Sequence, residues 1–209
     1  MKKLIPLLLL SLAWTSLAQP PDSPVRVVMN GFVADNVIAG SVTAVATKSD
    51  MLSLETTGLA NLEKKTKMPP DALFWIASMT KPMAAVCVLQ LQEAGKLSID
   101  DPVEKHLPEF AGQWMIEARL KGKLTLKKPA RAITIRDLLT HTSGLANTNS
   151  PRAESTLAEL TMAYSKTPLQ FEPGSRWSYS NAGINVLGRI VEVVSGTPFA
   201  EFLQTHVLN

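Results

Sequence analysis

The chain contains 209 residues, 45% of them hydrophobic, and its formal net charge is +3. A chain of this length and composition can bury a substantial core in one or two globular domains. Lys2 and Lys3 belong to a leader segment, and removing them from the 21 basic residues leaves 19 against 18 acidic residues, an excess of one. With so small an excess and no nucleic-acid-binding motif, the sequence argues against a DNA- or RNA-binding protein.

The N-terminal residues have the pattern of a secretory signal peptide. Two lysines precede an apolar run from Leu4 to Leu12, and the small residues Ser16 and Ala18 follow. A basic start, a short apolar stretch and a small-x-small end predict a signal peptide over residues 1–18. An uncleaved membrane anchor is the alternative, although the apolar run is short for a bilayer span. We therefore expect a periplasmic or secreted protein.

The first part of the mature chain is expected to combine one helix with a β-hairpin. In the helix, we expect Val28, Phe32 and Val33 to face the core. The two strands are rich in β-branched residues and are joined by a short polar turn, which favours antiparallel pairing. The expected elements are a linker (19–24), the helix (25–34), the strands (40–47 and 51–57) and a charged loop (62–70).

A second helix is predicted to lead up to Gly95, a residue suited to a helix C-terminus. Pro82 is tolerated only near the start of a helix, so Ser78 is expected at or just before the first turn. A helix N-terminus presents free N–H groups and positive partial charge. The apolar face of this helix is predicted to consist of Met83, Val86, Leu89 and Leu91.

The single cysteine and the three histidines do not form a metal-binding pattern. Cys87 lies within an apolar run and is predicted to pack in the core. His106, His141 and His206 are far apart in the sequence and accompany no cysteine pair. The sequence therefore predicts neither a metal site nor a cofactor.

From Ser98 onward the pattern is mostly helical. The basic stretch 119–131 is predicted to be a solvated loop or hairpin, and Thr134 with Asp137 resembles a capping box. The remaining expected elements are a short helix ending by Gly144, a helix over 156–165, a loop over 171–179, a helix closed by Gly196 and a last helix after Thr197 and Pro198. In the helix before Gly196, the predicted core face is Ile184, Leu187, Ile190, Val191 and Val194.

The main catalytic candidate is the serine–lysine pair Ser78 and Lys81. Residues three apart lie on the same face of a helix, so the lysine amine can reach the serine oxygen. Lysine accepts a proton readily only where burial or nearby positive charge lowers its pKa, and the apolar side chains expected to bury it are Phe74, Trp75, Ile76 and Met83. Ser-x-x-Lys occurs by chance about once in a chain of this composition, so a helix-capping serine beside a solvated lysine is the alternative.

A second candidate element lies about a hundred residues further on. Tyr179 could relay a proton, since a phenol near an ammonium group ionises more easily. Asn181 has an amide that could hold a substrate amide or ester, and the alternative is that it caps the helix starting near Ala182.

Three sequence blocks resemble one family in order and spacing. They are Phe74–Pro82, Ile135–Leu145 (Ile-Arg-Asp-Leu-Leu-Thr-His-Thr-Ser-Gly-Leu) and Glu172–Gly196, which opens Glu-Pro-Gly-Ser-Arg-Trp-Ser-Tyr-Ser-Asn. Together they resemble the serine β-lactamase family, class C branch, with the related D-alanyl-D-alanine peptidases and family VIII esterases. The Tyr-x-Asn element distinguishes this branch from class A enzymes, which use Ser-Asp-Asn.

The resemblance implies a role for each matching residue. Ser78 would be the acylated nucleophile, with its backbone N–H as one oxyanion donor. Lys81 would share its proton, Tyr179 would act as general base, and Asn181 would orient Lys81 and the substrate. His141 is expected to be a hydrogen-bonded turn residue instead of a catalytic base. The substrate would be a β-lactam, a D-amino-acid peptide or an ester. We expect the protein to be a monomer.

The implied fold is an α/β (α+β) β-lactamase and penicillin-binding-protein-like fold. Residues 19–96 would form the N-terminal part of the α/β domain, with an incomplete antiparallel sheet and the nucleophile helix. Residues 97–209 would form a mostly helical domain. The family's third motif, a Lys-Thr-Gly-like triplet, is missing, so we expect a truncated chain that ends before the returning strands.

Two other function classes are weaker. A non-catalytic relative could use the groove that contains these site residues to bind or sense penicillin or peptidoglycan peptide. An α/β-hydrolase is disfavoured because no Gly-x-Ser-x-Gly sequence occurs in the chain.

Overall fold

The computed structural model describes residues 23–147 and 154–209. The predicted signal peptide, residues 1–18, lies outside the described residues, and so does most of the predicted linker. No helix in the described part is long and apolar enough to cross a membrane. The chain divides into two compact units between Trp75 and Ile76.

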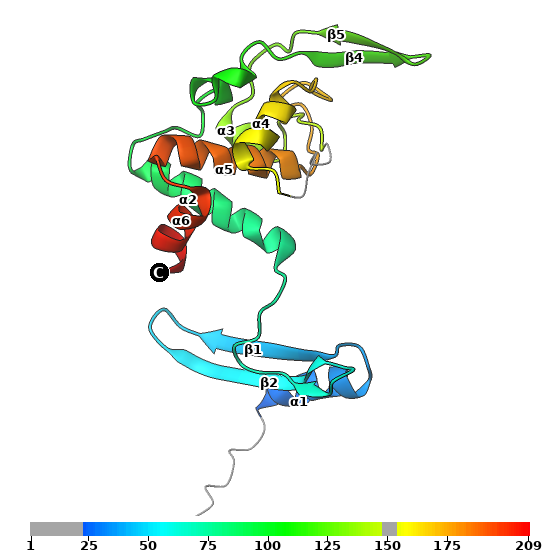
Figure 1. Ribbon diagram of the computed structural model, residues 1–209, viewed down its shortest axis with the longest axis vertical. Coiled ribbons are helices and arrows are strands. Elements are labelled where there is room, and N and C mark those ends of the chain that lie inside the picture. The colour runs from blue at the N-terminus through cyan, green and yellow to red at the C-terminus, as the bar shows by residue number, and fades with distance from the viewer. Residues whose placement is uncertain (1–22, 148–153) are drawn as a thin grey trace, which may run out of the picture. The chain divides into compact units, whose positions relative to one another are not determined.

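The first unit contains one helix and a small sheet. Helix α1 (Pro24–Ala34) begins with Ser23 as its cap, because the Ser23 side chain accepts a hydrogen bond from the Arg26 N–H. Strands β1 (Gly40–Ala46) and β2 (Met51–Asn61) pair antiparallel, which confirms the predicted hairpin. A two-residue strand β3 (Thr66–Lys67) extends the sheet within the segment predicted to be loop only (Figure 1).

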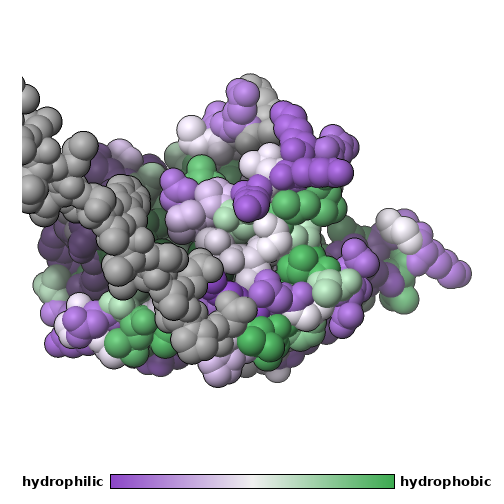
Figure 2. All heavy atoms as spheres, turned by 90° about the horizontal axis from the view of Figure 1, so that it is seen from below, coloured by the Kyte–Doolittle hydropathy of each residue, from purple (hydrophilic) through white to green (hydrophobic). Residues whose placement is uncertain are grey.

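The first unit buries few side chains. Helix α1 contains no buried residue, and Val28 and Phe32 are 55% and 44% exposed, so the expectation that they face a core is wrong. Among the described residues of this unit, only Glu55 and Thr57 are buried. Figure 2 shows hydrophobic side chains at the surface on the face it displays. The physical reason is that a helix with a one-sided apolar pattern still needs a partner surface large enough to cover it.

The second unit is built around two packed helices. Helix α2 (Thr80–Glu93) follows a 3-10 turn (Ala77–Met79) and packs against α5 (Asn181–Ser195). Helix α5 is buried along one face, which includes Leu187, Ile190 and Val191, as predicted. It also contacts α3, α4 and α6 (Figure 1). This packing creates the hydrophobic core of the unit.

The buried face of α2 differs from the predicted one. Leu91 is buried as predicted, but Val86 and Leu89 are each 41% exposed. The other buried residues of the helix are Ala84, Cys87 and Val88. This helix is apolar on nearly all sides, so its periodicity could not determine which face packs on α5. The prediction that Cys87 is a core residue is confirmed, because its side chain is 0% exposed and its burial raises the pKa of the thiol.

The shorter helices begin where the sequence indicates. Helix α3 (Ile135–Leu139) opens with the predicted capping box of Thr134 and Asp137, and α4 (Leu157–Ser165) opens with a second one. Helix α6 (Phe199–Leu203) continues into a π-helical turn (Gln204–Leu208). Two 3-10 turns, Val103–Lys105 and Pro108–Phe110, connect α2 to the next strand.

The basic stretch forms a two-stranded hairpin, one of the two predicted alternatives. Strands β4 (Met115–Leu120) and β5 (Lys123–Lys127) pair antiparallel, and every residue of β5 is exposed. The base of the hairpin joins the unit through a hydrogen bond from the Ile116 N–H to the Leu169 carbonyl.

The contacts place α2 with the second unit, whereas the sequence grouped the nucleophile helix with the preceding strands. The reason is that its buried side chains pack on α5, a contact that residues far downstream provide. The division at residues 96 and 97 concerns the domains of the complete fold and stays a prediction.

Candidate active site

Ser78 lies at the exposed start of the second unit. It occupies the 3-10 turn directly before α2, where the sequence predicted it. Its neighbour Ala77 has a φ of +44°, a left-handed conformation that is uncommon for a residue with a Cβ. The backbone N–H of Ser78 makes no hydrogen bond to another described residue, so it is available to a ligand oxygen.

Three of the four predicted site residues come together at the Ser78 hydroxyl. Lys81 lies one turn further along α2, and its Nζ donates a hydrogen bond to Ser78 Oγ at 3.1 Å. Tyr179 reaches the same oxygen from the segment before α5, and its hydroxyl donates at 2.8 Å. The Lys81 Nζ also lies 4.7 Å from the centre of the Tyr179 ring. One serine oxygen therefore accepts from both an amine and a phenol.

The electrostatics of this cluster favour ionisation of the phenol. The hydrogen bond with Lys81, followed by the one with Ser78, lowers the pKa of Tyr179, and the positive charge of Lys81 adds to the effect. When Tyr179 is ionised, its oxygen becomes an acceptor at hydrogen-bond distance from the Ser78 hydroxyl. The geometry thus provides a route for the serine proton.

Within the second unit, Lys81 is half-buried, and two of the apolar residues expected to enclose it, Ile76 and Met83, belong to this unit. Ile76 is 41% exposed and Met83 is half-buried. Phe74 and Trp75 belong to the first unit, so their part in burying Lys81 stays a prediction.

Asn181 lies beside the cluster without joining its hydrogen bonds. Its side chain makes no hydrogen bond to another described residue, Lys81 included. It is also not the helix cap: α5 begins at Asn181, and Ser180 caps it by accepting a hydrogen bond from the Gly183 N–H at 3.0 Å. The amide of Asn181 is exposed and free to meet a ligand.

The loop that follows α3 holds the Tyr179 segment. The His141 carbonyl accepts from the Ser178 N–H at 2.8 Å, and His141 Nδ1 accepts from the Ser180 N–H at 3.2 Å. The hydrogen-bonding role expected for His141 is therefore confirmed. Asn147 continues the pattern, donating to the Tyr179 carbonyl at 2.8 Å and accepting from the Asn181 N–H at 2.9 Å.

No motif in the sequence singles out Asn147. The signal present in the sequence is weak, since one asparagine shortly after the His-Thr-Ser-Gly block is ordinary for a loop. Only its contacts identify it, because its partners lie 32 and 34 residues away along the chain.

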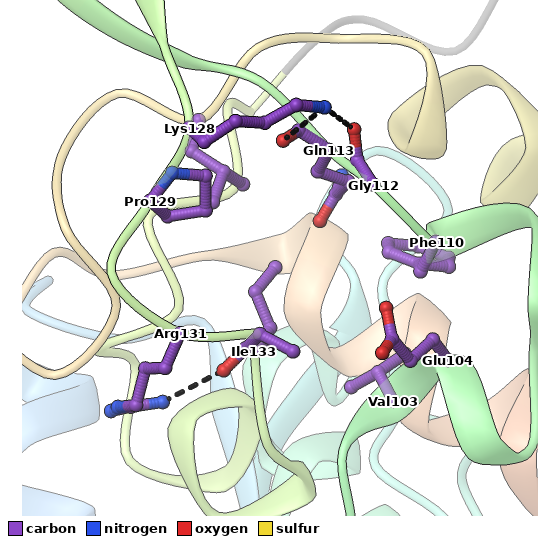
Figure 3. A pocket seen from close by; sticks show the side chains of 11 residues that line it. Val103, Glu104, Phe110, Gly112, Gln113, Lys128, Pro129, Arg131 and Ile133 are labelled. Atoms are coloured by element: carbon purple, nitrogen blue, oxygen red, sulfur yellow. Dashed lines mark hydrogen bonds between the residues drawn. The ribbon is translucent and has the colours of Figure 1, made fainter.

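A separate cavity of about 200 Å³ lies elsewhere in the unit, and its lining includes Val103, Glu104, Phe110, Lys128 and Arg131. Figure 3 shows that the cations at its edge are already paired. Lys128 donates to the Gly112 and Gln113 carbonyls, and Arg131 donates to the Ala132 carbonyl. None of the predicted site residues lines this cavity. Within the described ranges, no three His, Cys, Asp or Glu residues gather in a way that could hold a metal ion.

The chain is similar to known proteins of one family. A family model described as Beta-lactamase matches residues 25–209, and the chain belongs to this family. The recognised resemblance and the β-lactamase and penicillin-binding-protein-like fold class are both confirmed.

The relatives include esterases, penicillin-binding proteins and β-lactamases. Esterase EstB of Burkholderia gladioli is 36% identical over 179 residues, which cover 78% of this chain and 43% of EstB. A penicillin-binding protein of Bacillus subtilis is 32% identical over 178 residues, covering 80% of this chain and 35% of the relative. The chain therefore spans less than half the length of these relatives.

Solved structures give the same picture. EstCE1, described as a hydrolase with promiscuous acyltransferase activity, matches with a TM-score of 0.71 at 28% identity, covering 88% of this chain and 49% of EstCE1. A class C beta-lactamase from Rhodobacter sphaeroides matches with a TM-score of 0.65 at 29% identity, covering 87% of this chain and 47% of that enzyme.

Proposed function

We propose that this chain is the N-terminal part of an exported serine hydrolase that works through an acyl-enzyme on Ser78. The observation that carries the proposal is the convergence on Ser78 Oγ of the Lys81 amine at 3.1 Å and the Tyr179 hydroxyl at 2.8 Å. A serine hydroxyl is a weak nucleophile until a neighbouring group accepts its proton. Membership of a family that includes named esterases and β-lactamases supports the same reaction class.

The residues would divide the work as follows. Ionised Tyr179 accepts the Ser78 proton while the serine oxygen attacks the substrate carbonyl, and Lys81 stabilises the phenolate. The unpaired Ser78 N–H donates to the oxyanion that develops on the carbonyl oxygen. The free amide of Asn181 binds the amide or ester group next to the reacting carbon. Collapse of the tetrahedral intermediate breaks the bond between the carbonyl carbon and the leaving amine or alcohol, which takes the proton from Tyr179. Water then hydrolyses the acyl-serine ester, which restores the Ser78 hydroxyl and frees the acid.

The proposed substrates share an acyl group that serine can accept, namely a β-lactam, a D-amino-acid peptide or a short ester. The names of the relatives span these chemistries, since they include an esterase, a penicillin-binding protein and a class C beta-lactamase. The complete protein would add the third motif and the second oxyanion donor beyond the residues given. Without them, we expect the present chain to be acylated but to turn over very slowly.

Intact-mass spectrometry tests the proposal directly. The chain is incubated with a fluorescent penicillin and, separately, with a p-nitrophenyl ester, and the mass of the protein is followed over time. We expect one acyl adduct, lost in Ser78→Ala and kept in Ser175→Ala, a matched change at an exposed serine of the loop before Tyr179. Peptide mapping should place the adduct on Ser78.

Two outcomes would contradict the proposal. An adduct that persists in Ser78→Ala would move the nucleophile elsewhere, and the absence of any adduct in the natural chain would favour a non-catalytic relative. Slow loss of the adduct is the result expected of a hydrolase. A penicillin adduct that stays unchanged throughout, together with no release of p-nitrophenol from the ester, would instead assign this site to penicillin binding or sensing, while keeping Ser78 as the nucleophile.

A further inference from the structure

His141 adopts a backbone conformation that residues other than glycine rarely adopt. Its φ is +59°, in the left-handed region, and it follows α3 directly after Thr140. Such strain persists only where the surroundings hold it, and it is concentrated at functional sites. Here the surroundings are the Tyr179 segment, which bonds to both the backbone and the ring of His141.

The imidazole of His141 supports the Tyr179 ring. The two ring centres are 4.8 Å apart with an angle of 36° between the planes, and Trp177 lies edge-on to the imidazole at 6.1 Å. Because the Ser180 N–H donates to His141 Nδ1, this nitrogen has to be an unprotonated acceptor. The ring thus holds Tyr179 from one side and fixes the next residue of the chain.

Protonation of His141 would reverse this arrangement. A protonated Nδ1 is a donor, so it would face the Ser180 N–H with no acceptor between them. The new positive charge would also be repelled by the Lys81 ammonium, whose charge already acts on His141. Burial, and after it the charge of Lys81, lowers the pKa of His141, which keeps the imidazole neutral near pH 7.

The other charged groups near His141 are directed elsewhere. On α3, the Asp137 carboxylate accepts from Arg131, Thr134 and Thr142. In the loop before Tyr179, Arg176 lies over the Phe171 ring and Glu172 accepts from the Ala130 N–H. Among the described residues of the second unit, the charged and titratable groups that face the imidazole are therefore Lys81 from α2 and Tyr179 itself.

We propose that His141 is a positioning residue for Tyr179: its neutral imidazole holds the phenol against Ser78 and Lys81, and protonation of the imidazole separates the phenol from them. The inference rests on the proposed function for its catalytic consequence, because loss of the cluster slows acylation of Ser78. It goes beyond that function by adding a pH-sensitive control to the site. His141 is not itself a proton acceptor for the serine in this scheme.

The first experiment measures the rate of Ser78 acylation by a fluorescent penicillin between pH 5 and pH 8. The ionised fraction of Tyr179 also decreases as the pH falls, so in the natural chain we expect the rate to fall more steeply below the His141 midpoint than above it, since only the neutral imidazole is competent. His141→Asn keeps an acceptor near Nδ1, tolerates the positive φ and does not titrate. We expect its rate at pH 8 to be lower than that of the natural chain, because the ring that supports Tyr179 is lost, and we expect the fall attributed to His141 to disappear.

Two further variants separate positioning from folding. His106→Asn is the matched control, because His106 bonds to Asp101 outside the site, and it should keep the natural pH profile. His141→Phe keeps an aromatic ring but removes the acceptor for the Ser180 N–H. We expect His141→Phe to lower the acylation rate at every pH. Because this is a second variant at the same position, the test does not depend on how well His141→Asn folds.

The second experiment does not depend on activity. The chain has three histidines and two tyrosines, so the ring signals of labelled His and Tyr can be followed individually by NMR. We expect the Tyr179 ring signals and the Ser180 amide signal to move at the His141 midpoint in the natural chain and in His106→Asn. In His141→Asn this movement should be lost.

These readings distinguish the two proposals. The positioning role would be overturned if the Tyr179 and Ser180 signals did not shift at the pH where His141 titrates. It would also be overturned if they showed the same pH titration in His141→Asn. An acid fall in acylation that His141→Asn leaves unchanged would overturn the control of the site by His141. A chain that is never acylated would refute the proposed function, while the NMR titration still decides whether His141 positions Tyr179.

Discussion

The two units of the chain contain similar apolar residues but bury them very differently. In the described part of the first unit, the buried residues are the polar Glu55 and Thr57, while Leu52 is 64% exposed. In the second unit, large apolar side chains such as Leu187 and Ile190 are fully buried. The difference follows from architecture, because a helix on a small sheet offers little apolar surface, whereas α5 packs against four other helices.

The first unit is organised by polar contacts instead of a hydrophobic core. The Glu55 carboxylate accepts hydrogen bonds from Ser23, Ser53 and Arg26, which joins the start of α1 to β2. The hydrogen bond from Ser23 is the main reason that the pKa of Glu55 is lowered. The second unit has its own core and also carries Ser78, Lys81 and Tyr179. A site that depends on close positioning thus lies on the better-packed unit.

The largest expected contrast is between two leucine truncations. Leu187→Ala should lower the free energy of unfolding by about 2–5 kcal/mol, because it leaves a cavity in the core. Leu52→Ala, the same change on the exposed strand β2, should alter it by no more than about 0.5 kcal/mol. Urea unfolding followed by circular dichroism measures both. Equal losses in the two variants would mean that the first unit also has a well-packed core.

The second-largest expected effect on the free energy of unfolding comes from Asp137, a buried carboxylate of the second unit. Burial alone would raise the pKa of Asp137, but hydrogen bonds from Arg131 and Thr134 outweigh it and leave that pKa lowered. We expect Asp137→Asn to cost roughly 1–3 kcal/mol, since it loses a charge-assisted pair and half of the α3 capping box. Urea unfolding at pH 7 gives this difference.

The pH dependence gives the Asp137 prediction a sign. Because the folded pKa lies below the unfolded one, the contribution is complete above about pH 4 and is lost as the pH falls through the folded pKa. Asp137→Asn should therefore flatten the loss of stability in acid. Glu55→Gln is the matched change in the first unit, and it should act locally, speeding amide exchange in α1 and β2. A large effect of Glu55→Gln on α2 or α5 would break the comparison.

The smallest expected effect compares two glycines of the second unit. Gly144 and Gly95 both have positive φ, +77° and +68°, but only at Gly144 would an added Cβ collide with a backbone oxygen, that of Phe171. We expect Gly144→Ala to cost roughly 1–3 kcal/mol and Gly95→Ala about 1 kcal/mol or less. Thermal unfolding of the two variants checks this order. A reversed order would mean that the loop around Gly144 can move away, and that it positions Tyr179 only loosely.

The sequence by itself determined the local elements of this protein. The capping box at Thr134 and Asp137, the hairpin of β1 and β2, and the spacing of Ser78 and Lys81 all depend on residues close together in the chain. For the same reason, the sequence alone places Ser78 at a helix start. Family blocks in the right order then linked Tyr179 to Ser78 and Lys81, a connection that no local rule provides.

Only the tertiary structure decided which surfaces meet. The face of α2 that packs on α5 and the exposure of Val28 and Phe32 could be read only from the tertiary structure. The same is true of the hydrogen bonds that join His141 and Asn147 to the segment that carries Tyr179. Ser78 and Tyr179 are 101 residues apart, and their contact depends on how whole helices pack. Such contacts reflect the free energy of burying shared surface, which no single segment contains.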